Sequence, residues 1–134
     1  MAGNKQHFWI DRRHPRISTA LPCQVAVAQD RMHPAQMHNL SPGGLKFSCS
    51  HETFIALLPE PQRTPGLVQD VRIDVQFELT LSGEQQPHTI RTQAAIVHTE
   101  RLSQDCYHIG AQFLQLQEKE IHVLENYVAE LTAP

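Results

Sequence analysis

The clearest pattern in this sequence lies at residues 71–81, Val-Arg-Ile-Asp-Val-Gln-Phe-Glu-Leu-Thr-Leu. Apolar side chains occupy every second position there, and polar or charged side chains stand between them. Successive side chains of a β-strand point to opposite faces, so a period of two is typical of a strand with one buried face. Residues 71–81 therefore predict a long strand whose apolar side faces the core.

The segments on both sides of this strand alternate in the same way. Together the predicted strands are residues 21–28, 35–40, 45–49, 71–81, 88–99 and 106–114. In the first of them, Leu21, Cys23, Val25 and Val27 should face inward. Six short strands with tight turns predict a mainly β protein, a six-stranded antiparallel barrel that is closed or nearly closed, since closure leaves no strand edge unpaired.

After Leu116 the apolar period changes from two to 3.6, which predicts a C-terminal α-helix at about residues 117–131. Its apolar positions are Ile121, Leu124, Val128 and Leu131. We expect this helix to cap one end or face of the barrel. Residues 51–66 combine a short apolar run with three prolines, so both a single helical turn and an irregular loop over the barrel mouth are open.

A chain of 134 residues with 40% apolar content is one domain of ordinary size. We expect a flexible arm at residues 1–10 and a single domain at residues 11–134, with the barrel at about 17–116. No apolar run approaches the roughly 20 residues that span a bilayer, and the polar start does not resemble a signal peptide. These observations predict a cytoplasmic protein.

Charge is distributed unevenly along the chain. The net charge is −3, but residues 1–16 hold four basic residues against one acid, a net +3, so the remainder carries −6. An acidic body would repel a nucleic-acid polymer lying across it, whereas a small anion needs only the basic arm. The sequence therefore disfavours a nucleic-acid partner and favours a small anionic ligand.

Metal and enzyme chemistry find little support in the sequence. The three cysteines are odd in number and lack a Cys-x-x-Cys, which argues against a disulfide framework and a zinc site. The nine histidines show no ligand spacing such as His-x-x-x-His. No nucleophile stands in a recognisable motif and no carboxylate pair suggests acid–base roles. We expect neither a metal, nor a cofactor, nor an enzyme.

Two polar clusters carry the functional signal. The first is the run Asp11-Arg12-Arg13-His14-Pro15-Arg16, whose three arginines repel one another unless an anion holds them together. The second is Asn39-Leu40-Ser41-Pro42-Gly43-Gly44, which combines hydrogen-bonding side chains with glycines that let a ligand approach the backbone. Together they predict a site for a planar ligand that carries phosphate.

These clusters resemble the paired signature of PilZ domains, the bacterial receptors for the second messenger cyclic di-GMP. Arg12-x-x-x-Arg16 matches the first motif, Asn39-x-Ser41-x-x-Gly44 matches the second, and Gly110-x-x-Phe113 matches a third family feature. The resemblance covers nearly the whole chain. It implies a six-stranded PilZ barrel with a C-terminal helix, which agrees with the strand and helix pattern, and a role in signal transduction through a downstream protein partner.

The resemblance also implies roles for particular residues. The implied cyclic di-GMP ligands are Arg12, Arg13, Arg16, Asn39, Ser41, Gly43 and Gly44. Arginine suits guanine and phosphate alike because its planar fork bonds either group and its face stacks on a base. His98 is a further candidate, because polar or aromatic side chains near that strand end contact the ligand in the family; an exposed strand end is the alternative.

Other interpretations stay open at this point. The arginines can form a solvated arm, and residues 39–44 can be a hairpin turn and nothing more. A barrel that ignores nucleotides and binds a protein through Phe8 and Trp9 or through the helix is the alternative function. In the mechanism that we favour, ligand orders the arm against the barrel. Asp11, which precedes the first motif arginine, favours one bound nucleotide over a stacked pair.

Overall fold

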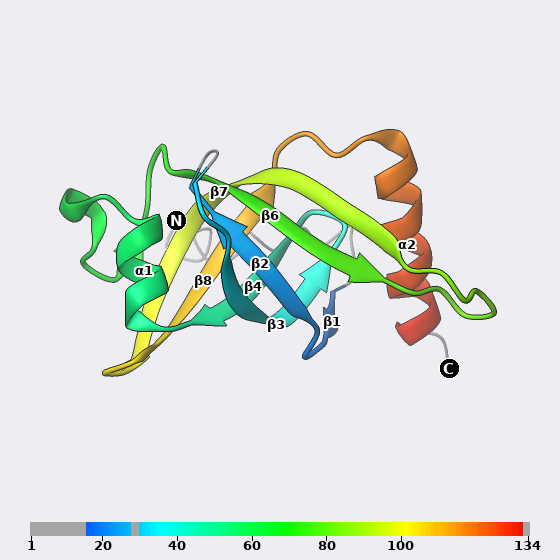
Figure 1. Ribbon diagram of the computed structural model, residues 1–134, viewed down its shortest axis with the longest axis horizontal. Coiled ribbons are helices and arrows are strands. Elements are labelled where there is room, and N and C mark those ends of the chain that lie inside the picture. Colours follow the sequence, from blue (N-terminus) through cyan, green and yellow to red (C-terminus); the bar gives the residue numbers. More distant parts are fainter. Residues whose placement is uncertain (1–15, 28–29, 133–134) are drawn as a thin grey trace, which may run out of the picture.

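The computed structural model describes residues 16–27 and 30–132 of the chain. Six of its strands form a closed antiparallel barrel (Figure 1): β2 (Pro22–Ala26), β3 (His33–Ser41), β4 (Gly44–Cys49), β6 (Arg72–Leu79), β7 (His88–Ser103) and β8 (Cys106–Phe113). They pair in the order β3-β2-β6-β7-β8-β4, and β4 pairs back with β3 to close the ring. The predicted six-stranded barrel is confirmed.

Two further strands of two residues each were not predicted, because so short a run shows no period. β1 (Ile17–Ser18) pairs with β3, and β5 (Gly66–Leu67) pairs with β7. The first half of β3 pairs with β2 and its last residues pair with β1. β1 therefore continues along β3 where β2 has ended.

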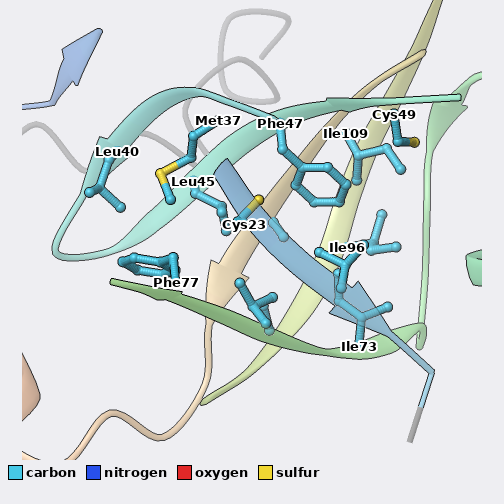
Figure 2. Close-up of a cluster of buried hydrophobic side chains, with 14 of the residues drawn as sticks. Cys23, Met37, Leu40, Leu45, Phe47, Cys49, Ile73, Phe77, Ile96 and Ile109 are labelled. Carbon is cyan, nitrogen blue, oxygen red and sulfur yellow. The ribbon is translucent and has the colours of Figure 1, made fainter. Parts of the chain in front are cut away.

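The alternating side chains fill the barrel from all sides. Met37, Phe47, Ile96 and Ile109 come from four different strands and point into the same interior (Figure 2), and each is at most 1% exposed. Burying such a side chain stabilises the fold by about 1.5–3 kcal/mol. The inward pattern fails at one predicted position: Val27 is 36% exposed, because β2 ends one residue before it.

The segment at residues 51–66 contains more regular structure than either predicted option. A helix of seven residues, α1 (His51–Leu57), begins after Ser50, whose Oγ accepts a hydrogen bond from the backbone N–H of Thr53 at 3.2 Å. A 3₁₀ turn, η2 (Glu60–Gln62), follows it. The Phe54 ring stacks on the Tyr107 ring of β8 with centroids 3.8 Å apart, which fixes α1 over one end of the barrel.

The predicted C-terminal helix is confirmed as α2 (Glu118–Thr132), which lies at the opposite end of the barrel from α1 (Figure 1). Its buried residues are Val123, Leu124 and Val128. The predicted inward position of Leu131 is wrong, since that side chain is 55% exposed in the last turn, where the helix runs past the barrel. In the described part of the chain, no helix is long and apolar enough to cross a membrane.

Candidate functional site

The described part of the arginine motif reaches the second motif through β1. Ile17 pairs with Leu40 and Ser18 pairs with Asn39, so the chain that leaves Arg16 runs antiparallel beside the end of β3. The backbone N–H of Thr19 extends this pairing with a bond to the carbonyl of His38 at 3.1 Å. Arg16 itself is exposed and lies one residue before β1. Predicted site residues Arg12 and Arg13 lie outside the described residues.

The second motif forms the β3–β4 hairpin. Asn39 and Leu40 belong to β3, Ser41 pairs with Gly44, and Pro42 and Gly43 make the turn. Ser41 is only 2% exposed, and its Oγ accepts a hydrogen bond from the backbone N–H of Gly43 at 3.1 Å. The glycines were expected to let a ligand approach the backbone, but the Gly43 N–H already has a partner inside the hairpin.

The last glycine of the motif is required by the barrel itself. A Cβ at Gly44 would overlap the carbonyl oxygen of Ala111 on β8 and would lie 3.2 Å from the Cα of Gln112. The backbone N–H of Phe113 bonds the carbonyl of Gly43 at 3.0 Å. The hairpin is therefore docked against the end of β8, which carries the third sequence match, and Gly44 serves strand packing at least as much as ligand approach.

Asn39 opens onto a surface groove of about 520 Å³ on the outer face of the barrel. The groove is lined by Ser18, Thr19, Ala20, His38, Asn39, Lys46 and His108. Lys46 and His108 were not predicted as site residues. They stand on β4 and β8, and only the register of the closed sheet brings them beside Asn39.

The strand register also relates His98 to this groove. Asn39 pairs with Lys46, Lys46 pairs with Gly110, and Gly110 pairs with His98, so these residues form one row across β3, β4, β8 and β7. His98 was expected near a strand end, but β7 continues to Ser103. It lies inside the strand, half-buried, in the row that begins at Asn39.

Two histidine rings contribute to the electrostatics of the groove. The His38 and His108 rings lie 4.5 Å apart between centroids. Partial burial lowers the pKa of His108, and the positive charges of His38 and Lys46 lower it further, while Glu100 acts in the opposite direction. In the absence of an anion, the groove therefore favours a neutral His108 ring.

Two buried cysteine thiols and the possible metal ligands of the described chain give no sign of a reactive site. Burial raises the pKa of Cys23 and of Cys49 to about 12, so both thiols stay protonated and unreactive. Within residues 16–27 and 30–132, no group of three or more His, Cys, Asp or Glu side chains could hold a metal ion.

The closed barrel, its terminal helix and the hairpin beside the groove define a small β-barrel domain. Residues 10–130 match the family model described as PilZ domain. The chain belongs to the PilZ domain family. A comparison with curated protein sequences gives no match.

Solved structures share this fold at low sequence identity. The inhibitor of motility MotI/DgrA of Bacillus subtilis is 15% identical with a TM-score of 0.67, over 90% of this chain and 51% of that one. PlzA of Borreliella burgdorferi, in complex with c-di-GMP, is 11% identical with a TM-score of 0.59, over 97% of this chain and 56% of that one. The chain thus spans about half the length of these two proteins.

A third structure matches over most of both chains. The PilZ domain of YcgR from Escherichia coli, with c-di-GMP, is 15% identical with a TM-score of 0.56, and the match covers 90% of each chain.

Proposed function

We propose that this chain is a non-enzymatic receptor for cyclic di-GMP that acts in bacterial second-messenger signalling. The observation that carries the proposal is the pairing of β1 with the end of β3, which brings Arg16 to the hairpin that holds Asn39 and Ser41. The described end of the arginine motif therefore lies beside the second motif. The YcgR PilZ domain and PlzA, which share this fold, are bound to c-di-GMP in their structures.

In this proposal, different residues of the site contact different parts of the ligand. The arginines Arg12, Arg13 and Arg16 grip phosphate and guanine through bidentate hydrogen bonds and stacking. Asn39, on the groove wall, hydrogen-bonds a guanine edge or a phosphate oxygen. Ser41, Gly43 and Gly44 fix the hairpin conformation that places Asn39 on the groove wall.

Signalling follows from the position of the arginines on the N-terminal side of β1. Cyclic di-GMP neutralises their mutual repulsion and ties residues 11–16 to the hairpin, which builds a new surface for a downstream protein partner. Ordering a residue costs about 1–2 kcal/mol of backbone entropy, and the charge-assisted contacts must exceed this cost. We propose one nucleotide per chain, since Asp11 does not favour a second set of phosphates.

Isothermal titration with cyclic di-GMP tests the proposal. We expect saturable binding by the wild-type chain, and Arg16→Ala should weaken it at least about tenfold, because one bidentate arginine contributes about 1–3 kcal/mol. Arg72→Ala is the matched control, since Arg72 is an exposed arginine on β6, away from the hairpin. A wild-type chain that shows no saturable binding, or an Arg16→Ala variant with unchanged affinity, contradicts the proposed site.

A further inference from the structure

We propose that His38, Lys46 and His108 form an anion subsite of the groove that takes a phosphate of the cyclic dinucleotide, and that the histidine pair takes up a proton on binding. The proposal rests on the proposed function and adds to it residues that neither motif contains. It also assigns the receptor a dependence on pH.

A β-bulge is what brings His38 to the groove. In a regular strand, adjacent residues face opposite sides, so His38 and Asn39 could not both line one surface. Met37 pairs with Phe47 but Asn39 pairs with Lys46, so His38 is an additional residue in β3 with no partner in β4. Bulges re-aim side chains and are frequent beside functional sites. Here the bulge places His38 and Asn39 together on the groove wall.

The other two side chains approach from neighbouring strands. Lys46 lies directly across from Asn39 in the β3–β4 register. His108 stands on β8, two residues before Gly110, and its ring meets the His38 ring at 4.5 Å. Gly110 has no side chain, so nothing from that position covers the sheet surface beside His108 and Lys46. The three basic groups thus converge on the wall that Asn39 begins.

The charges around the pair favour an anion. His108 is faced by His38 from β3, by Lys46 from β4, and by Glu100, its partner on β7. Glu100 is exposed to solvent, which weakens its field through screening. Ser18, Thr19 and Ala20 bring no charge to the β1 side of the groove. Among the described residues that face His108, two are basic and one is a solvated carboxylate.

Protonation and ligand binding are therefore linked. Without ligand, burial and the neighbouring positive charges of His38 and Lys46 hold the pKa of His108 below its ordinary value. A phosphate between these groups brings negative charge next to the ring, so it favours the imidazolium form and raises that pKa. Binding then takes up protons, and the affinity for the dinucleotide must rise as the pH falls.

Calorimetric titration with cyclic di-GMP between about pH 8 and pH 6, in buffers of different ionisation enthalpy, tests this linkage. The wild-type chain should take up a proton on binding and bind several-fold more tightly at the lower pH. Lys46→Gln should weaken binding about tenfold at every pH, the typical effect of losing a charged hydrogen-bond donor. His108→Gln should flatten the pH profile. His122→Gln, an exposed histidine of α2 with 68% side-chain exposure, is the matched control and should change nothing.

A second measurement covers the case in which a variant does not fold. The imidazole C–H signals of His38 and His108 in the wild-type protein are followed by NMR through a pH titration, with and without cyclic di-GMP. The proposal expects the midpoint of the His108 ring to move upward with ligand. Ligand binding that is weakened by Arg16→Ala, with no proton uptake and an unmoved His108 midpoint, overturns the subsite and leaves the proposed function standing. A wild-type chain that does not bind overturns both.

Discussion

Gly44 on β4 faces the carbonyl oxygen of Ala111 on β8 so closely that no side chain fits between the two strands. The contact lies where the β3–β4 hairpin docks on the end of β8, a dock that is completed by the bond from the Phe113 N–H to the Gly43 carbonyl. The final glycine of the second motif is thus fixed by barrel closure, and this gives it a measurable role in stability that is independent of any ligand.

Gly44→Ala should lower the free energy of unfolding by at least about 1–3 kcal/mol, since the added methyl group must push two paired strands apart. Urea denaturation measures the effect. Gly83→Ala is the control: its φ of +82° disfavours alanine, but open space surrounds the new methyl group, so about 1 kcal/mol is expected. A Gly44→Ala cost no greater than that of Gly83→Ala contradicts the packing argument.

Asn39→Ala should affect ligand binding, whereas Ser41→Ala should affect stability. Asn39 lines the groove, so its loss should weaken cyclic di-GMP binding with little change in stability. Ser41 is buried and bonds the Gly43 N–H, so its loss should cost about 1 kcal/mol of stability by leaving that donor without a partner. Titration calorimetry and urea denaturation of both variants measure the two effects. Equal stability of the two variants would contradict the different roles assigned to Asn39 and Ser41.

Acid should weaken the fold through His108. The pKa of His108 lies below its ordinary value of 6.5 in the folded protein, so the unfolded chain binds the proton first as the pH falls. The neutral ring therefore contributes stability that is fully present above about pH 6.5 and is lost as the pH falls through the unfolded and then the folded pKa. Urea denaturation at about pH 7.5 and pH 5.5 measures the slope, which should be smaller in His108→Gln. An unchanged slope in that variant counts against His108 as its source.

Phe54→Ala should detach α1 from its end of the barrel. The Phe54 side chain is 1% exposed and stacks on Tyr107, so its loss should cost about 3–5 kcal/mol. Ala56→Gly, at an exposed position of the same helix, should cost only about 1 kcal/mol. Guanidinium denaturation compares the two. Similar costs would show that the helix depends on its own propensity and not on the Phe54–Tyr107 stack.

Ligand should change amide hydrogen exchange in the arginine segment. If cyclic di-GMP ties the arginines to the hairpin, exchange at residues 5–16 should slow on its addition, because their amides become part of an ordered site. The amides of α2, at residues 118–132, serve as the internal control and should not change. Binding without added protection at residues 5–16 would rule out arm ordering as the signal.

Much of the fold follows from local pattern. The alternation from Val71 to Leu81 and the helical period after Leu116 predict β6 and α2, because each element buries one face along most of its length. The local pattern does not decide the structure of residues 51–66, because α1 is held by a distant ring, Tyr107. Leu131 misleads for the opposite reason, since the helical period continues past the point where the barrel ends.

The candidate site was predicted in part for a similar reason. Its motifs are contiguous in sequence, so Arg16, Asn39 and Ser41 could be named in advance. Lys46 and His108 reach the groove through the register of three strands, and His38 reaches it through a bulge. A slip of one residue in pairing would turn each of these side chains to the other face. Such residues become visible only when the sheet is assembled.

The ring of six strands closes without β1, which pairs only with β3. β3 keeps β2 along its first half and β4 along its second when β1 lets go, so the barrel wall remains intact while the chain that carries Arg16 peels away. The retained wall still presents Asn39 to solvent. Detachment of β1 breaks a pairing of only two residues, but it also uncovers Ile17, which is 7% exposed in the barrel core, so occupancy of the site is coupled to the packing of the core.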